Sequence, residues 1–416
     1  MQTTWTCGEH DGKMPRPVWE YLTVSDAAID NVFLPYEIKA TQAHTAALVH
    51  AGVLTKRDRV RLETALKALL REARAGRAVV TADAEDCHTF VELHLTKRLG
   101  ALGRKIQTGR SRNEQALTMI RLYLRDKSSA IRTEVQALKK GLRALAKKHR
   151  HVRMPGYTHS QRAMPVSVAT YFESFRDSLT DDMLLLDRTM LVLNQSPGGS
   201  AAGFGLPSPW PKEVVRRELG FRKVQKNPVY CQASRGKFER MFIFCLENLA
   251  ATVCRLACDL VMFTMQEFGF FSLPAGFTTG SSLMPHKRNY DVFELARASR
   301  ATIAAAGMES GLHGFNLVSG YHRDLQRTKG PLVKAVEEML SLLTVLRLAL
   351  GRLAVNEDRM RSAVTSEMHS TADALALAMS GVPFRDAYQR IKGNLLPQKP
   401  PLAPPRATRR TRHRRS

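Results

Sequence analysis

Residues 234–268 read SRGKFERMFIFCLENLAATVCRLACDLVMFTMQEF, an apolar segment with few charges. Wound as a helix, the segment places apolar side chains around most of its circumference, whereas a helix on a protein surface keeps one polar face. This pattern predicts a helix that is buried on several sides. Such helices occur in the core of a helical bundle or at an interface between subunits.

Long helices are also predicted on the N-terminal side of this segment. Residues 113–148 contain no proline and a single glycine, and their apolar residues recur at helical spacing. A helix of roughly thirty residues would be about 45 Å long. Residues 166–193 show the same spacing, and residues 56–75 form a shorter amphipathic pattern with Thr55 as its N-cap. Three helices well above the usual length of about 11–12 residues predict an elongated all-α protein, a shape that often self-associates.

The composition along the chain suggests how it divides. We predict an N-terminal helical domain (residues 1–106), a central long-helix bundle domain (107–352) and a shortened C-terminal helical domain (353–396). The tail rich in proline and arginine (397–416) is predicted to be disordered, because it lacks the apolar residues that could bury a core. The expected fold is an elongated multi-helix body with small helical domains at both ends.

The net charge of the 416-residue chain is +25 at pH 7, of which residues 399–416 supply +7, leaving 25 − 7 = +18 for the rest. A basic field attracts nucleic acids and also small anionic substrates. The lysines and arginines are scattered along the predicted helices with few interleaved aromatic residues, which is typical of a solvated surface. We therefore expect a small anionic substrate and no nucleic acid partner.

Composition also argues against other classes of protein. No run of 18 or more apolar residues predicts a transmembrane helix, and the N-terminus is polar where a secretion signal needs an apolar run. The six cysteines form no CxxC pair and lack the ligand spacing of a zinc site. We therefore expect free thiols in a reducing cytoplasm, no bound metal and no membrane association.

Three irregular segments interrupt the helices, and loops of this kind often carry function on a rigid scaffold. The most informative is TGSSLMPHKRN, residues 279–289, within a loop over residues 276–290. Lys287 and Asn289 supply an ammonium and an amide that suit a carboxylate. Ser281 can remove a proton only where cations or backbone donors stabilise its alkoxide. A polar surface loop before a helix would have the same composition.

The second irregular segment is GYTHSQRAMP, residues 156–165. His159 can donate or accept a proton near neutral pH, and Thr158 and Gln161 can hold a carboxylate. A surface loop that happens to carry a histidine is the alternative interpretation.

The third irregular segment ends in TGRSRN, residues 108–113. Arg112 can donate two parallel hydrogen bonds to a carboxylate, and Asn113 can add an amide donor. The alternative is a basic helix N-terminus, which is unusual because the helix dipole disfavours cations there. A bound anion would relieve that conflict.

Together and in this order, the three segments resemble the fumarase/aspartase superfamily, whose hallmark is GSSLMPHKRN in the signature loop, residues 276–290. Within the superfamily, the sequence is most similar to argininosuccinate lyases. The resemblance runs from about Tyr21 to Phe384. It passes through seven segments: LPYEIKATQAH (34–44), EDCHTFVE (85–92), TGRSRNEQ (108–115), GYTHSQRAMP (156–165), SRGKFE (234–239), the signature loop and YHRDLQRTK (321–329).

The resemblance implies a fold, an assembly and a reaction. Members of the family are all-α homotetramers whose long central helices form a helical-bundle core on tetramerisation, and three subunits contribute loops to each active site. The implied reaction is the reversible β-elimination of argininosuccinate to arginine and fumarate, the last step of arginine biosynthesis. It proceeds by general acid and base catalysis, with no metal and no organic cofactor.

The resemblance also implies roles for the matching side chains. Ser281 would act as the base and His159 on the leaving nitrogen, with the assignment of the two proton roles left open. Glu294 would pair with His159 and raise its basicity, and Lys287 would help to stabilise the carbanion. Other residues would bind the succinyl half or the arginine half of the substrate: Arg112, Asn113, Thr158, Gln161, Asn289, Tyr321, Gln326 and Lys329.

The sequence departs from the family pattern in four places. Glu114 stands where an aspartate is usual, and Tyr290 stands where a proline usually follows Asn289, which would loosen or redirect the signature loop. The serine that usually contacts the substrate near the N-terminus has Ser25 or Asp26 as its nearest match. The Pro/Arg-rich tail stands in place of the family's last helices, as a natural truncation or a shifted reading frame would produce.

Two other functions fit the same motifs. MPHKRN is closer in wording to adenylosuccinate lyases, whereas YHRDLQ and TGRSRN favour argininosuccinate lyases. A sister lyase that acts on adenylosuccinate or another succinyl adduct is therefore one alternative. A non-catalytic, crystallin-like relative is the other.

Overall fold

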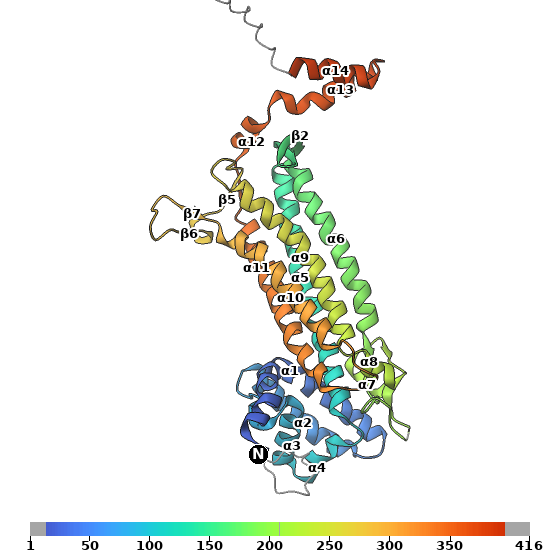
Figure 1. Ribbon diagram of the computed structural model, residues 1–416. Helices are drawn as coiled ribbons and strands as arrows, with labels where there is room; N and C mark the ends of the chain where they lie inside the picture. Colours follow the sequence, from blue (N-terminus) through green and yellow to red (C-terminus); the bar gives the residue numbers. More distant parts are fainter. Residues whose placement is uncertain (1–13, 208, 396–416) are drawn as a thin grey trace, which may run out of the picture. The chain divides into compact units, whose positions relative to one another are not determined.

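The structure is a computed structural model that describes residues 14–207 and 209–395 (Figure 1). The predicted tail, residues 397–416, lies outside the described residues. The chain forms two compact units. Within the described residues, the main unit consists of residues 14–145 and 172–354 except residue 208, and the second unit consists of residues 146–171 and 355–395.

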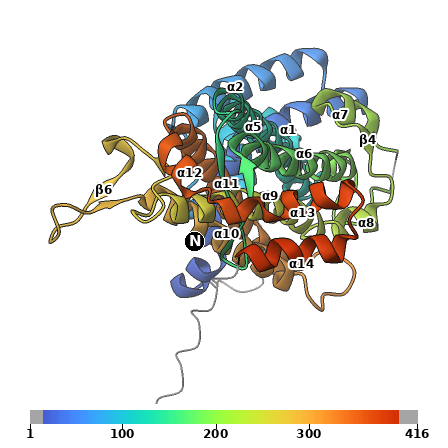
Figure 2. The ribbon, with the colours of Figure 1, turned by 90° about the horizontal axis from the view of Figure 1, so that it is seen from above.

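Among the described residues, five long helices lie side by side in the main unit (Figures 1 and 2). α9 packs against α10 and α11, and the Thr252 hydroxyl of α9 donates to Asp182 of α6 at 2.6 Å. This arrangement confirms the predicted all-α fold with long central helices. The five are α5 (Arg112–Lys148), α6 (Val168–Leu193), α9 (Lys237–Phe263), α10 (Asp291–His313) and α11 (Lys329–Leu350).

α9 is the helix that the sequence predicted to be buried on several sides. Residues 228–263 are long and apolar enough to cross a membrane by length and composition alone, but most of the apolar window is buried. Contacts with α6, α10 and α11 account for this hydrophobicity. Its inward side chains recur every three or four residues: Phe238, Phe242, Leu246, Leu249, Val253, Leu256, Leu260 and Phe263.

The helix predicted over residues 234–268 is shorter at both ends. Gly236 has φ +78°, a left-handed conformation that separates α9 from the short helix before it. The Gly236 N–H donates to the Glu239 carboxylate at 2.8 Å, which fixes the start of α9. At the other end the chain turns after Phe263, and the Phe268 ring packs edge-on against the Phe263 ring with centroids 6.0 Å apart.

A buried arginine of α5 joins the bundle to the segment that precedes α9. Arg121 donates to the Gln195 carbonyl oxygen at 2.8 Å, to Gln225 Oε1 at 2.6 Å and to Ser234 Oγ at 2.7 Å. Burial lowers the pKa of Arg121 to about 10. The three acceptors replace the water that this cation loses on folding.

At one end of the bundle, α1 packs against α2, α3 and α7. Thr55 caps α2 as predicted, because its hydroxyl accepts the Asp58 N–H at 3.1 Å and Asp58 accepts the Thr55 N–H in return. The Tyr123 ring of α5 is fully buried, with its centroid 5.0 Å from that of Phe33 and 5.6 Å from that of Tyr36. The helices here are α1 (Arg16–His50), α2 (Lys56–Arg74), α3 (Cys87–Leu99), α4 (Ala101–Arg104) and α7 (Lys212–Leu219).

Short elements connect the helices of the main unit. β3 pairs in parallel with β4, and β6 pairs antiparallel with β7. The 3-10 turns are η1 (Ala82–Ala84), η2 (Lys105–Gln107), η3 (Ala275–Phe277) and η4 (Arg323–Thr328). The other short elements are β3 (Gln195–Ser196), β4 (Lys223–Val224), α8 (Pro228–Ala233), β5 (Phe271–Ser272), β6 (Thr279–Gly280), β7 (Arg288–Asn289) and β8 (Ala354–Val355).

The second unit contains a β-hairpin where the sequence predicted an irregular segment. β1 (Arg153–Thr158) pairs antiparallel with β2 (Gln161–Ser167). Thr158 pairs with Gln161, so His159 and Ser160 alone form the turn, with φ of +52° and +59°. Positive φ at both central residues is typical of the type I′ turn that matches the twist of two strands.

Four short helical elements complete the described part of the second unit. The first of them packs on β1, and its Glu357 Oε1 lies 2.8 Å from Nδ1 of the buried His149. The elements are α12 (Glu357–Ala363), η5 (Ser366–His369), α13 (Ser370–Met379) and α14 (Phe384–Leu395).

Candidate active site

Five of the twelve side chains nominated from the sequence lie around one pocket of the main unit, which we call the Lys329 pocket. Its cavity measures about 150 Å³, and its wall comes from α1, the start of α3 and the residues before it, the start of α5, the segment between α8 and α9, and the segment around η4. Asp26, a candidate for the N-terminal substrate contact, also lines it. The side chain of the other candidate, Ser25, lies outside the described residues. The five are Arg112, Asn113, Tyr321, Gln326 and Lys329.

Lys329, the first residue of α11, is a buried cation held between two carboxylates of α1. Its Nζ lies 2.6 Å from Asp26 Oδ1 and 2.5 Å from Asp30 Oδ1. Burial alone would lower the pKa of Lys329, but Asp30 and Asp26 outweigh it and raise the pKa. Burial raises the pKa of Asp26, which Lys329 opposes. Burial would also raise the pKa of Asp30, but Lys329 and His88 together with the hydrogen bonds to the carboxylate lower it.

Arg112 begins α5 and faces the acidic residues that precede α3. Its Nη1 lies 2.9 Å from Glu85 Oε2 and 3.1 Å from Asp86 Oδ2, and its Nη2 donates to Thr89 Oγ1 at 2.6 Å. The unfavourable placement of a cation at a helix N-terminus is thus offset by two carboxylates from the chain itself. The guanidinium is oriented in the pocket wall before any substrate binds.

Asn113 lies beside a glycine-rich loop, residues 197–205. Its Nδ2 donates to the Ala202 carbonyl oxygen at 3.4 Å. The next residue, Glu114, is buried and accepts the N–H groups of Gly199 at 2.9 Å and Ala201 at 2.7 Å through the same carboxylate oxygen. Burial raises the pKa of Glu114 to about 7, although the two N–H groups oppose the rise.

The segment around η4 closes the Lys329 pocket near the N-terminal end of α1. Gln326 Nε2 donates to the Leu22 carbonyl oxygen at 3.1 Å. Arg323 donates to the same oxygen at 3.3 Å, and its Nη2 lies 3.6 Å from Glu85 Oε1. The Tyr321 ring is covered by the Arg235 guanidinium, whose carbon lies 5.1 Å from the ring centroid.

A buried ion cluster supports the pocket from α1. Glu37 is fully buried, with one carboxylate oxygen 3.0 Å from His88 Nδ1 and the other 3.1 Å from Arg110 Nη2. Burial would raise the pKa of Glu37, but His88 and Arg110 lower it to about 2. Two of the segments that carry the resemblance, 34–44 and 85–92, therefore meet in this cluster.

The signature loop extends from the bundle at the N-terminal end of α10 (Figure 1), where a short β6–β7 ladder and a hydrogen bond from the Thr279 hydroxyl to Asp291 hold its two ends together. Ser281 Oγ accepts the backbone N–H of Met284 at 3.0 Å and that of Leu283 at 3.2 Å. Asn289 Nδ2 donates to the Thr279 hydroxyl at 3.4 Å. Lys287 is exposed.

One chain does not bring the signature loop to the Lys329 pocket. The loop precedes α10, the pocket segment follows it, and α10 has 23 residues, a length of about 34 Å at 1.5 Å per residue. Figure 1 shows β6 and β7 at the far end of α10 from α1 and α3. Glu294, one turn into α10, is exposed at the loop end.

His159, Thr158 and Gln161 belong to the second unit, where they lie at the tip of the β1–β2 hairpin. All three side chains are exposed. The nominated residues therefore divide into three groups: the Lys329 pocket, the signature loop with Glu294, and the hairpin tip.

A sequence profile described as "Lyase" matches residues 18–304. The argininosuccinate lyase of Thermotoga neapolitana is 36% identical over 374 residues, which cover 90% of this chain and 94% of that protein. The chain belongs to the argininosuccinate lyase family. The enzyme of the same name from Sorangium cellulosum is 40% identical over 390 residues, covering 93% of this chain and 89% of that protein. The predicted family is confirmed.

Solved structures of related lyases share the fold of this argininosuccinate lyase family member. A variant of EDDS lyase with bound fumarate has a TM-score of 0.76 at 21% identity, covering 91% of this chain and 76% of that one. A class II fumarase from Schistosoma mansoni has a TM-score of 0.73 at 16% identity, with coverages of 89% and 88%. At these identities the likeness establishes the fold alone.

Several residues of the Lys329 pocket were not predicted from the sequence. Asp30, Glu85 and Arg235 line or support the Lys329 pocket and had no role assigned. Glu85 and Arg235 lie within segments that carry the resemblance to argininosuccinate lyases, so the signal was present. Asp30 lies four residues after Asp26, on the same face of α1, and helical spacing from that candidate would have found it.

Proposed function

We propose that this protein is an argininosuccinate lyase, which splits argininosuccinate into arginine and fumarate. The observation that carries the proposal is its 36–40% identity to argininosuccinate lyases over about nine-tenths of the chain. The charges of the Lys329 pocket support it, because the pocket mixes cations and carboxylates and suits a zwitterionic substrate.

The proposed reaction begins with loss of a proton from the succinyl carbon β to the leaving nitrogen. Ser281 takes this proton, and the two backbone N–H groups that already bond its Oγ favour the alkoxide form. Lys287 and Asn289 stabilise the negative charge that develops on the adjacent carboxylate. The electron pair then forms the fumarate double bond as the C–N bond breaks.

The departing guanidinium nitrogen must receive a proton. His159, supported by Glu294, is the proposed donor, directly or through water. Thr158 and Gln161 hold the succinyl carboxylates together with Arg112 and Asn113. The steps are proton transfers and an elimination, so no metal or organic cofactor is required. We leave open whether the proton roles of Ser281 and His159 are exchanged.

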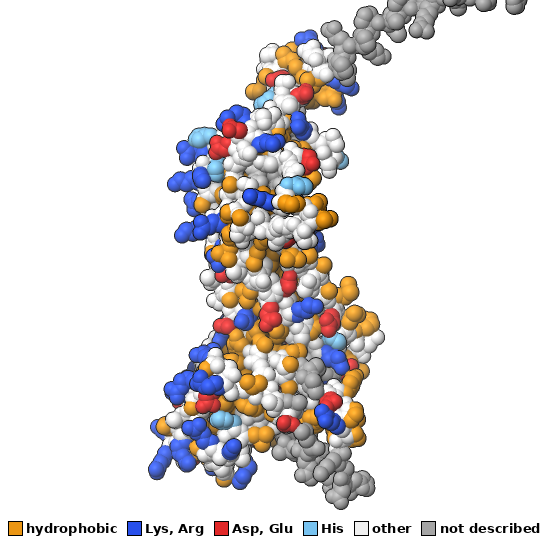
Figure 3. Space-filling view, turned by 90° about the vertical axis from the view of Figure 1, so that its left-hand side faces the viewer, with side chains coloured by type: hydrophobic (Ala, Val, Ile, Leu, Met, Phe, Trp, Pro, Cys, Tyr) orange, Lys and Arg blue, Asp and Glu red, His pale blue; other side chains and the backbone are white. Residues whose placement is uncertain are grey.

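We further propose a cytoplasmic homotetramer whose active sites are each shared by three subunits. The supporting argument is the length of α10, which separates the signature loop from the Lys329 pocket by about 34 Å within one chain. Hydrophobic side chains gather along the bundle of the main unit in Figure 3, and α10 exposes Leu295, Met308 and Leu312. A second copy of the bundle could cover such a surface.

Turnover and assembly test these proposals together. Purified protein should raise ultraviolet absorbance as fumarate forms from argininosuccinate and not from adenylosuccinate. Ser281→Ala should abolish turnover, whereas Ser282→Ala, its neighbour in the same loop, should retain it. Sedimentation should give a tetramer for all three proteins. A tetramer that turns over neither substrate would favour a non-catalytic relative, and a fully active Ser281→Ala variant would refute the assigned base.

A further inference from the structure

Arg235 is a buried arginine that attracts the carboxylates of Asp26 and Glu239 but contacts neither of them directly. It lies between α8 and α9, and only 6% of its surface is exposed. Within the described residues it takes part in no ion pair, and its Nε has no hydrogen-bond partner. Its guanidinium instead lies over the Tyr321 ring at 5.1 Å. Stacking orients the guanidinium without neutralising it.

The other cations of the Lys329 pocket are each matched by a carboxylate. Lys329 has Asp26 at 2.6 Å and Asp30 at 2.5 Å. Arg112 has Glu85 at 2.9 Å. The remaining cation of the wall is Arg323, whose Nη2 lies 3.6 Å from Oε1 of the same Glu85. Arg235 therefore stands apart from every other cation in the pocket wall.

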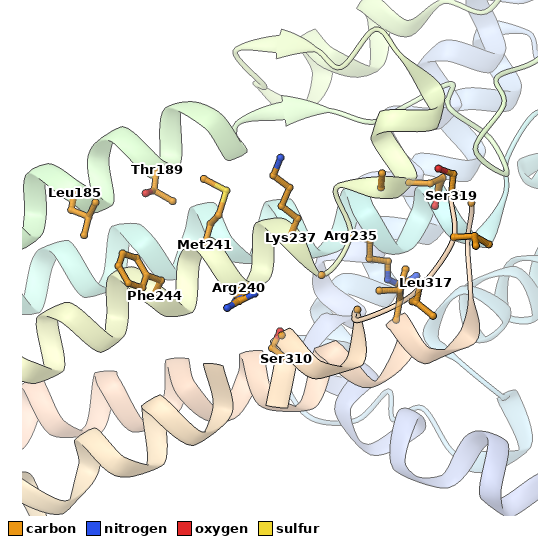
Figure 4. Close-up of a pocket in the computed structure, with 18 residues that line it drawn as sticks. Leu185, Thr189, Arg235, Lys237, Arg240, Met241, Phe244, Ser310, Leu317 and Ser319 are labelled. Atoms are coloured by element: carbon orange, nitrogen blue, oxygen red, sulfur yellow. The ribbon is translucent and has the colours of Figure 1, made fainter. Parts of the chain in front are cut away.

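A second cavity that Arg235 also lines supplies no acid either. It measures about 680 Å³, and Figure 4 shows Arg235 in its wall with Lys237 and Arg240 from the first turns of α9. Among the described residues that line it there is no aspartate or glutamate. A buried cation without a directly bonded carboxylate is costly, and a cation kept at such a place points to an anion that arrives with a ligand.

We propose that Arg235 binds the α-carboxylate of the arginine half of the substrate and so selects for an α-amino acid at that end. The inference rests on the proposed function, in which Tyr321, Gln326 and Lys329 face the arginine half. The α-carboxylate is the one anionic group in that half. A guanidinium offers it two parallel N–H donors, and the nearby Asp26 offers a counter-charge for the α-ammonium.

The test compares L-arginine with agmatine, which is arginine without its carboxylate. Calorimetry should show wild-type protein binding arginine more tightly than agmatine, and Arg235→Gln should lower the affinity for arginine about 10- to 100-fold, as expected for a lost charged hydrogen bond. The affinity for agmatine should stay the same. In turnover assays the same variant should raise KM for argininosuccinate and leave kcat nearly unchanged, since the α-carboxylate is remote from the breaking bond.

Two further variants separate binding from folding. Arg235→Lys keeps the charge and should recover part of the preference for arginine. Arg240→Gln removes an exposed arginine from the same stretch of α9 and should behave as wild type. The inference would be overturned if Arg235→Gln left the ratio of arginine affinity to agmatine affinity unchanged. It would also be overturned if the wild-type protein bound the two ligands equally. Selective arginine binding without turnover would instead preserve the inference and refute the proposed function.

Discussion

The buried carboxyl of Glu114 should make the free energy of unfolding fall as pH rises, and Glu114→Gln should remove this dependence. The residue follows Asn113 at the start of α5 and is 4% exposed. One of its oxygens accepts the N–H groups of Gly199 and Ala201, which have positive φ of +81° and +50°. Glu114→Gln keeps a side-chain oxygen that can accept both N–H groups, and removes the titrating proton.

The magnitude follows from the pKa of this carboxyl, which burial raises from 4.5 to about 7. The native state therefore holds the proton more tightly than the unfolded chain between pH 4.5 and 7. Where the native state binds more protons, the free energy of unfolding falls as pH rises. A pKa difference of about 2.5, at 1.36 kcal/mol for each unit, gives an upper limit of about 3 kcal/mol. This stabilisation is complete below pH 4.5 and is lost by about pH 7.

Urea unfolding of the wild type and Glu114→Gln at pH 5, 6, 7 and 8 measures this effect. A single protein concentration is needed because assembly also contributes to stability. The free energy of unfolding of the wild type, minus that of the variant, should fall as pH rises to about 7. Above that pH the difference should stay constant. The charged or titratable groups around the carboxylate, Arg110, Lys212, His44 and Cys231, are common to both proteins and cancel in the difference. Glu134→Gln, which removes a partly exposed carboxylate of α5, controls for net charge. A difference between wild type and Glu114→Gln that is constant from pH 5 to 8 would refute the reasoning.

Three other substitutions test the packing of the main unit by the same urea assay. Lys329→Met leaves Asp26 and Asp30 buried without their cation and should cost about 3–5 kcal/mol; a loss below 1 kcal/mol would mean that water reaches the cluster. Arg121→Met removes the donor to three buried acceptors and should cost about 3 kcal/mol, whereas a neutral effect would show that the acceptors find other donors. Phe242→Ala empties a fully buried site of α9 and should cost about 3–5 kcal/mol, and a much smaller loss would indicate that the bundle collapses onto the space.

The long helices could be predicted from the sequence because their signal is local. From apolar residues at helical spacing we predicted a helix over residues 113–148. The observed helix, α5, has the same ends to within one residue. Thr55 with Asp58 three positions later is a capping box that can be read directly. The start of α9 was misplaced, because Gly236 acts through a left-handed backbone conformation that apolar periodicity does not report.

The β1–β2 hairpin could not be predicted by the usual signal. Two-residue turns of this kind favour Asn-Gly or Gly at the positions of positive φ, and here His159 and Ser160 occupy them. The strands also carry prolines, Pro155 and Pro165, which normally count against a strand. A histidine held in a left-handed turn is costly locally, so its position depends on the pairing of the flanking strands.

Only some of the residues that line the Lys329 pocket could be predicted from the sequence. Local motifs nominated Arg112 and Lys329, but the partners of these cations come from distant parts of the chain. Lys329 and Asp30 are 299 positions apart. A motif identifies a residue type that suits a ligand, whereas only the fold shows which cations are already neutralised, and Arg235 became distinctive for that reason.

This balance of charge also separates the two candidate substrates. The pocket wall holds four cations and three carboxylates, Asp30 behind Lys329 adds a fourth carboxylate, and His88 is paired with Glu37. The formal sum is 4 − 4 = 0, and among these four cations Arg235 is the one that forms no ion pair within the described residues. The arginine half of argininosuccinate brings one carboxylate together with an ammonium and a guanidinium, which such a pocket can match. Adenylosuccinate would bring a phosphate dianion in their place, and two negative charges against a single unpaired cation would be repelled by the carboxylates around it.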